Sequence, residues 1–170
     1  ELILSIITEL KPVEGRFQPF RSMDGKMAIV DYAHSPDALE NVLKTLKEIR
    51  KKNSRIITII GAGGDRDRTK RPLMGKIAES YSDQVVLTSD NPRSEDPEKI
   101  IEEMKEGIRD QSAVLAITDR KEAIKTALTL ARKDDMVLVA GKGHETYQEI
   151  KGKRHHFDDK EVIMEVFKIY

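Results

Sequence analysis

Apolar segments of strand length alternate with segments of helical periodicity along most of this sequence. Residues 55–60 and 135–140 are short, mostly apolar runs, which are typical of strands covered on both faces. Between them, apolar residues recur every three or four positions, as in amphipathic helices. Strands that alternate with such helices form parallel βαβ units with right-handed crossovers. We therefore predict a single α/β domain with an open, mostly parallel, Rossmann-like sheet and helices on both faces.

Turn residues and capping residues set the expected bounds of these elements. Ser35 can cap a helix whose first position is Pro36, and Asp119 with Glu122 resembles a capping box. A turn at Asp24-Gly25 is expected to separate two short strands. The predicted strands span residues 17–20, 27–31, 55–60, 84–88, 113–117 and 135–140. The predicted helices span residues 1–11, 36–49, a segment around 74–78, a segment starting at 96–98, 119–130 and 159–170, with a hairpin-like connection at 151–157.

Charge and composition argue against several classes of partner. The sequence has 30 basic and 30 acidic residues, so it lacks the basic excess of domains that bind nucleic acids or acidic membranes. It contains no cysteine, which excludes disulfides and thiol chemistry. No apolar run reaches the roughly 18 residues of a membrane helix, and residues 1–10 lack the basic region of a signal peptide. We expect a cytoplasmic protein without nucleic-acid or membrane partners.

Four polar, glycine- or proline-rich loops follow four of the predicted strands. They are residues 31–34 (Asp-Tyr-Ala-His), 61–67 (Gly-Ala-Gly-Gly-Asp-Arg-Asp), 90–93 (Asp-Asn-Pro-Arg) and 141–145 (Gly-Lys-Gly-His-Glu). Ligands of open α/β sheets bind beyond the carboxyl ends of the strands, where such loops meet. Each loop alone is also consistent with ordinary turn chemistry and solvated side chains. Four of them at one sheet edge favour a ligand site.

The residue types in these loops indicate an anionic or zwitterionic ligand. Glycines at 61, 63 and 64 let backbone N–H groups approach an anion, and three basic residues follow at 66, 70 and 71. Asn91 and Arg93 can hold a carboxylate, whereas Glu145 can receive an ammonium group. The glycine loop is not a phosphate-binding Walker A loop, since no Gly-Lys-Ser/Thr follows it.

Taken in order, these motifs resemble the Mur ligase family. The matching segments are residues 15–18 (Gly-Arg-Phe-Gln), 31–36, 61–67, 70–74 (Lys-Arg-Pro-Leu-Met), 90–93 and 141–145. The resemblance runs from residue 15 to about residue 160. It implies that residues 1–14 end a preceding ATP-binding domain and that residues 15–170 form the C-terminal domain of a longer, three-domain enzyme.

The resemblance also implies an activity. The family uses ATP and magnesium to activate a terminal carboxylate of a UDP-MurNAc-peptide as an acyl phosphate, and the amine of an incoming amino acid displaces the phosphate. The Asp-Asn-Pro-Arg form is the pattern of members that add meso-diaminopimelate to UDP-MurNAc-L-Ala-D-Glu in peptidoglycan precursor synthesis. The expected partners are therefore meso-diaminopimelate, ATP, the UDP-MurNAc-dipeptide and the protein's own N-terminal and central domains.

Roles for individual residues follow from the same resemblance. Arg16 matches an arginine that reaches the ATP phosphates, Asp31 matches the aspartate at the ATP ribose, and His34 lies in the same motif. The residues that match the diaminopimelate site are Arg71, Asp90, Asn91, Arg93, Gly141 and Glu145. The Walker A loop and the modified lysine that carries magnesium belong to the central domain of the family. We therefore expect no catalytic residue and no metal ligand in this chain, and no turnover by the chain alone.

Three alternatives stay open from the sequence. The same type of ligase could use L-lysine or lanthionine, although Arg93 favours a diamino acid with a second carboxylate. A nucleotide-binding oxidoreductase domain would share the glycine-rich turn, but its third fingerprint glycine would fall at position 66, which is arginine. A stand-alone amino-acid sensor would bind diaminopimelate without any ATP-linked domain.

Overall fold

The computed structural model describes residues 13–169. The expected helix at residues 1–11 lies outside these residues, as does most of the segment assigned to a preceding domain. The elements in chain order are β1 (Gln18–Arg21), β2 (Met27–Asp31), α2 (Pro36–Ile49), β3 (Ile56–Ile60), α3 (Lys70–Tyr81), β4 (Gln84–Leu87), α4 (Pro97–Lys105), η1 (Gln111–Ala113), β5 (Val114–Ala116), α5 (Arg120–Leu130), β6 (Met136–Ala140), β7 (Tyr147–Ile150), β8 (Lys153–His156) and α6 (Asp159–Phe167).

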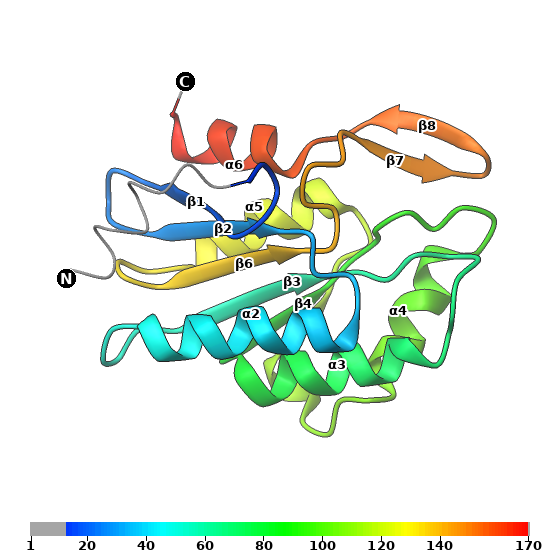
Figure 1. The fold of residues 1–170 in the computed structure, drawn as a ribbon, viewed down its shortest axis with the longest axis horizontal. Helices are drawn as coiled ribbons and strands as arrows, with labels where there is room; N and C mark the ends of the chain where they lie inside the picture. Colours follow the sequence, from blue (N-terminus) through cyan, green and yellow to red (C-terminus); the bar gives the residue numbers. More distant parts are fainter. Residues whose placement is uncertain (1–12, 170) are drawn as a thin grey trace.

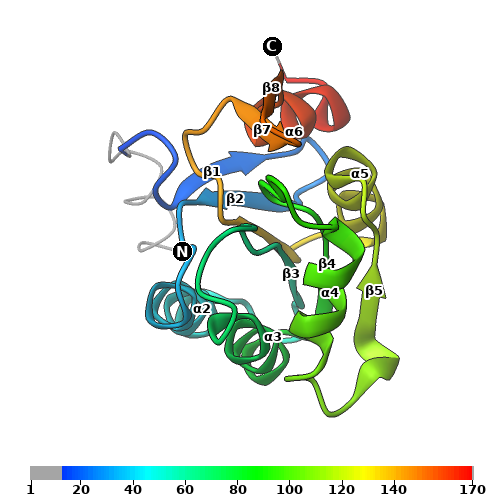
Figure 2. The same cartoon turned by 90° about the vertical axis from the view of Figure 1, so that its right-hand side faces the viewer.

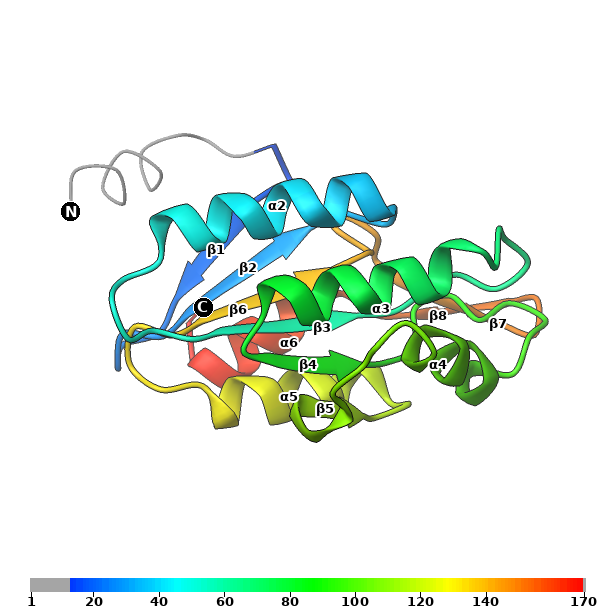
Figure 3. The ribbon, with the colours of Figure 1, turned by 90° about the horizontal axis from the view of Figure 1, so that it is seen from below.

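Six strands form one open sheet in the order β1-β2-β6-β3-β4-β5 (Figure 1). Only β1 runs antiparallel to its neighbour, so the prediction of a mostly parallel sheet is confirmed. The register places Asp31 opposite Ala140. The parallel strands therefore end at one edge of the sheet, where the connecting loops gather (Figure 3).

Helices cover both faces of the sheet, as predicted. Helices α2, α3 and α4 pack on one face and helices α5 and α6 on the other (Figure 2). Strands β3 and β6 are buried at every position because they lie in the middle of the sheet between these two layers. Their continuous apolar character is what a strand buried on both faces requires.

The predicted helix starts are also confirmed. The Ser35 side chain accepts a hydrogen bond from the Ala38 N–H and caps α2, while Pro36 occupies the first turn. Asp119 caps α5 by accepting from the Glu122 N–H. These bonds satisfy N–H groups that have no partner within a helix.

The segment after β6 differs from the prediction. The hairpin-like connection expected at residues 151–157 is a hairpin that begins earlier, at Tyr147, and pairs β7 with β8. Lys151 and Gly152 form its two-residue turn with φ values of 49° and 73°, as a tight primed turn requires. The hairpin extends beyond the sheet edge and meets the 90–93 loop through a bridge between Arg93 and Ile150 (Figure 1).

Within residues 13–169, no helix has both the length and the apolar character needed to cross a bilayer.

Candidate functional site

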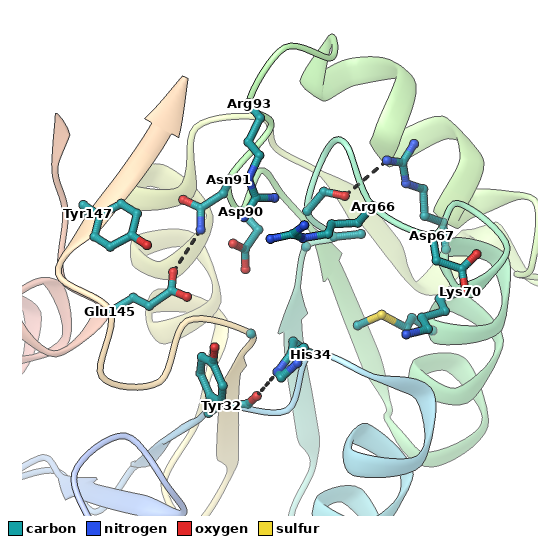
Figure 4. A pocket seen from close by; sticks show the side chains of 16 residues that line it. Tyr32, His34, Arg66, Asp67, Lys70, Asp90, Asn91, Arg93, Glu145 and Tyr147 are labelled. Atoms are coloured by element: carbon teal, nitrogen blue, oxygen red, sulfur yellow. Dashed lines mark hydrogen bonds between the residues drawn. The ribbon is translucent and has the colours of Figure 1, made fainter. Parts of the chain in front are cut away.

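A cavity of about 520 Å³ lies at the carboxyl ends of β2, β3, β4 and β6 (Figure 4). The four predicted loops build its wall together with Tyr147 of β7. The expected site residues that line it are His34, Arg71, Asp90, Asn91, Arg93, Gly141 and Glu145. The position agrees with the rule that open α/β sheets bind ligands beyond their carboxyl strand ends.

Backbone contacts hold neighbouring loops together. The Gly64 N–H donates to the Asn91 carbonyl at 2.9 Å. A Cβ added to Gly64 would overlap the Pro92 carbonyl oxygen, so only glycine allows the 61–67 and 90–93 loops to lie this close. In the same way, a Cβ on Gly143 would collide with the Gly15 carbonyl oxygen. The cavity wall is therefore one connected backbone structure.

One end of the cavity carries acidic and amide groups. The Asn91 side-chain N–H donates to Glu145 Oε2 at 2.9 Å, which joins the 90–93 and 141–145 loops (Figure 4). Asp90 lies beside them, and burial raises the pKa of its carboxyl group while the charges of Arg120 and Lys142 oppose that shift. Among the described residues, neither oxygen of Asp90 accepts a hydrogen bond, although Lys142 Nζ lies 3.8 Å from its Oδ1. This end can receive a cationic group.

Lys142 lies behind the same end of the cavity and contacts residues of its lining, which the sequence did not indicate. The alternative interpretation of this loop, an ordinary turn with solvated side chains, is wrong for Lys142 because the residue is fully buried. Its ammonium group donates to Asn91 Oδ1 at 3.1 Å and to Glu145 Oε2 at 3.2 Å. The burial of Lys142 could have been inferred from its place in the loop that directly follows a buried strand.

The other end of the cavity carries cationic groups. Arg93 has a φ of 52° and is fixed on both sides, since its N–H donates to the Glu149 carbonyl and its own carbonyl accepts from Lys151. One guanidinium N–H donates to the Gly64 carbonyl at 2.7 Å. Arg66 and Lys70 also line the cavity, and neither forms an ion pair within residues 13–169. Figure 4 shows Arg66 and Arg93 pointing into the cavity from two different loops.

Arg71 is more constrained than the sequence suggested. Its guanidinium group is buried and pairs bidentately with Glu95 at 2.8 and 2.9 Å, and it also donates to Glu103 at 2.7 Å. The hydrogen bonds from Arg71 lower the pKa of Glu95 to about 2. Only the Nε–H of Arg71 has no partner among the described residues. Arg71 therefore joins α3 to the 94–103 segment, and its buried Nε–H is the one donor that these contacts leave free among the described residues.

The three residues expected at ATP lie around Tyr32. The Asp31 carboxylate accepts the N–H groups of Phe17 and Ala33, both at 2.8 Å, and so ties β1 to β2. Arg16 lies over the Tyr32 ring, with 5.6 Å from its guanidinium carbon to the ring centroid. His34 Nδ1 donates to the Tyr32 carbonyl at 2.8 Å. Of these expected residues, His34 faces the cavity, while Arg16 and Asp31 lie outside its wall.

No group of three or more His, Asp or Glu side chains in the described part of the chain could hold a metal ion.

Comparisons with known proteins agree with the geometry. A family model described as "Mur ligase, glutamate ligase domain" matches residues 15–143. The chain is 55% identical over 169 residues to a UDP-N-acetylmuramoyl-L-alanyl-D-glutamate–2,6-diaminopimelate ligase of Phocaeicola vulgatus, covering 98% of this chain and 35% of that protein. It is 53% identical over 154 residues to the ligase of the same name from Aquifex aeolicus, covering 91% and 31%. The chain thus spans about a third of the length of these relatives.

Solved structures give the same result. A structure of a UDP-N-acetylmuramoyl-L-alanyl-D-glutamate–2,6-diaminopimelate ligase superposes with a TM-score of 0.85 and 46% identity, covering 98% of this chain and 34% of that one. A folylpolyglutamate synthase of Thermotoga maritima superposes with a TM-score of 0.58 at 23% identity, covering 76% and 28%, which is a similarity of fold alone.

Proposed function

The chain belongs to the Mur ligase family, and on that premise we propose that it is the amino-acid-binding domain of a ligase of the UDP-N-acetylmuramoyl-tripeptide synthetase type. The whole enzyme would add meso-diaminopimelate to UDP-MurNAc-L-Ala-D-Glu at the expense of ATP. The two relatives named as UDP-N-acetylmuramoyl-L-alanyl-D-glutamate–2,6-diaminopimelate ligases are identical to the chain at more than half of the aligned residues. The chain itself would supply the amino-acid site.

The observation that carries the proposal is the separation of charge within one cavity. In Figure 4, Glu145 lies on one side of the cavity and Arg66 and Arg93 on the other, with Asp90 between them. Each half of meso-diaminopimelate carries one ammonium and one carboxylate group. We assign the distal ammonium to Glu145, with the Gly141 carbonyl beside it, and the distal carboxylate to Arg93 and Asn91. Lysine lacks that carboxylate and would leave the Arg93 guanidinium with only Glu149, whose Oε2 lies 3.6 Å from its Nε, as an anionic partner.

Arg71 would contribute through its remaining Nε–H rather than through a bidentate clamp, because Glu95 and Glu103 occupy the rest of its guanidinium group. Arg66 is the stronger candidate for a second carboxylate contact, since it faces the cavity and has no acidic partner within residues 13–169. An arginine there can bind a carboxylate with two parallel hydrogen bonds.

The family uses ATP and magnesium, and in this enzyme both would be held mainly by the domains that precede this chain. ATP would transfer a phosphoryl group to the terminal carboxylate of the UDP-MurNAc-dipeptide and leave as ADP, and the reacting amine of the bound amino acid would then displace phosphate from the acyl phosphate. Arg16 and His34 lie on the Tyr32 side of the cavity, where they would meet the nucleotide. The Asp31 carboxylate already accepts the N–H groups of Phe17 and Ala33, so it would bind the ribose through its remaining oxygen lone pairs. We place no catalytic residue and no metal ligand within the chain.

Calorimetric titration of the chain with meso-diaminopimelate, L-lysine and lanthionine tests this proposal. We expect meso-diaminopimelate to bind and L-lysine not to bind, and Arg93→Ala to abolish the difference. Binding of lysine with equal affinity would contradict the assignment of Arg93. If the isolated chain binds none of them, the same titration of the full-length ligase with its nucleotide substrate and an ATP analogue decides, because domain closure can complete such a site.

A further inference from the structure

Lys142 is a buried cation behind the acidic end of the cavity, and nothing in the proposed reaction uses it. Its side chain is completely buried, although lysine is among the residues most rarely found in a protein interior. Burying an ammonium group is costly unless acceptors surround it. Here Asn91 and Glu145 accept its hydrogen bonds, Asp90 Oδ1 lies at 3.8 Å, and the Tyr147 ring centroid lies at 5.5 Å.

The contacts of Lys142 fix the orientation of Asn91. The Asn91 carbonyl oxygen accepts from Lys142 Nζ and from the Glu149 N–H, at 3.1 and 2.9 Å. With both donors on the oxygen side, the Asn91 amide nitrogen must face Glu145, where it donates to Oε2 at 2.9 Å. Glu145 Oε2 thus receives two donors, and among the described residues Oε1 receives none. One carboxylate oxygen is left for a ligand.

When Asp90 and Glu145 are both ionised, the charges around Lys142 balance only if one more cation is present. Asp90 and Glu145 contribute two negative charges when ionised and Lys142 contributes one positive charge. The remaining charged groups beside Asp90 are Arg120 and Asp159, which neutralise each other through a buried bidentate ion pair. With both carboxyl groups ionised, the set carries a net charge of about −1, which one ammonium group would neutralise; that cation would also favour the ionised form of Asp90 against the effect of burial.

We propose that Lys142 is a positioning residue for the diamino acid: its ammonium group orients Asn91 and Glu145 and leaves one net negative charge for the substrate's distal ammonium. This inference rests on the proposed function. Lys142 does not touch the substrate in this arrangement, because its side chain is completely buried outside the cavity lining and two of its three N–H donors bond to Asn91 and Glu145. Two close carboxylates without Lys142 would repel each other and hold a proton that competes with the substrate.

Steady-state kinetics of the full-length ligase test the proposal. Lys142→Met removes the charge at similar length, and Lys142→Arg retains the charge. We expect Lys142→Met to raise the KM for meso-diaminopimelate about ten- to hundredfold, the range for losing hydrogen bonds between charged groups, and to leave the KM for ATP unchanged. Lys142→Arg should restore much of the loss. Thermal unfolding of both variants checks that they fold.

The pH profile separates positioning from a merely structural role. Because the Lys142 charge lowers the pKa of Asp90, its removal should keep Asp90 protonated to a higher pH. A protonated Asp90 attracts an ammonium group less, so the acid limb of kcat/KM for meso-diaminopimelate should move to higher pH in Lys142→Met and stay in place in Lys142→Arg. A rise in KM by the same factor at every pH would overturn the role of Lys142. A wild-type ligase that meso-diaminopimelate does not saturate at any pH would instead overturn the proposed function.

NMR spectroscopy of the wild-type chain gives a measurement that needs no variant. An ammonium group enclosed by Asn91 and Glu145 should exchange slowly with water and give a 15N signal near neutral pH, unlike the exposed lysines. Addition of meso-diaminopimelate should shift this signal, while L-alanine, which has no distal ammonium, should not. A Lys142 ammonium in rapid exchange with water would overturn the proposal, whether or not the Met variant folds.

Discussion

We expect Asp159→Leu to lower the free energy of unfolding by about 3–5 kcal/mol, the range for removing one partner of a buried ion pair. Arg120 begins α5, Asp159 begins α6, and neither side chain is exposed to solvent. The pair joins the two helices on one face of the sheet. A third bond, from Arg120 to the Ala140 carbonyl at 3.1 Å, connects them to the end of β6 just before the 141–145 loop.

The magnitude follows from the geometry of the pair. Two parallel hydrogen bonds of 2.8 Å join the guanidinium and carboxylate groups. Hydrogen bonds to charged groups contribute about 1.5–3 kcal/mol each, so two of them agree with the range above. Leucine removes both acceptors, and an arginine cannot shed its proton to escape the resulting buried charge. Arg120→Met should cost less, because the carboxyl group that remains can take up a proton.

Urea unfolding followed by circular dichroism measures these changes. The double variant Arg120→Met/Asp159→Leu should recover most of the loss, since apolar side chains replace buried ion pairs with little cost. Lys121→Met is the matched control: Lys121 lies next to Arg120 and pairs with Glu165 at the surface, and its replacement should leave stability nearly unchanged. A loss below about 1 kcal/mol for Asp159→Leu, or a double variant as unstable as the sum of the single ones, would refute the reasoning.

Three further predictions concern the cavity and its surroundings. In the full-length ligase, Arg93→Ala should weaken the use of meso-diaminopimelate by about 2–4 kcal/mol in kcat/KM, the scale for losing a buried charge-assisted pair; an unchanged kcat/KM would remove Arg93 from the site. Arg16→Ala should lower kcat more than it weakens amino-acid binding, because its proposed partner is ATP; an equal loss of diaminopimelate affinity in calorimetry would contradict this role. Arg71 lowers the pKa of Glu95 from its usual 4.5 to about 2, so the stability that this pair contributes is complete above about pH 4.5 and is lost as the pH falls toward 2. Glu95→Gln should therefore flatten the acid side of a stability–pH curve, and a curve identical to the wild type would exclude the pair as its cause.

The sheet and helices could be predicted because their signals are local. The apolar runs of β3 and β6 and the caps Ser35 and Asp119 each depend on a few neighbouring residues. The β7–β8 hairpin was placed too late because β8 is exposed at all four positions and its residues, Lys-Arg-His-His, show no alternation of polar and apolar side chains. The start of the hairpin at Tyr147 depends on the pairing of β7 with β8 across the turn, and the periodicity of the sequence does not reveal this pairing.

The site was predictable in position but not in its internal pairing. Loops that follow parallel strands must meet at one sheet edge, so the location followed from the parallel direction of the predicted strands. The partners of Arg71 lie 24 and 32 residues away, at Glu95 and Glu103, and no sequence pattern connects them. Lys142 likewise has its amide partner 51 residues away, at Asn91. Which charges are neutralised within the protein, and which are left for a ligand, was therefore visible only in the structure.

The backbone contacts between the loops affect how the amino-acid specificity of such a site could be changed. Gly64 lies against Pro92, Gly143 against Gly15, and Arg93 is bridged to the hairpin. A substitution in one loop therefore displaces the loops that it contacts, and its effect on ligand binding depends on the residues in those loops. An engineer who wishes to redirect the enzyme to another amino acid would do better to graft all the loops together with the hairpin than to exchange residues one at a time.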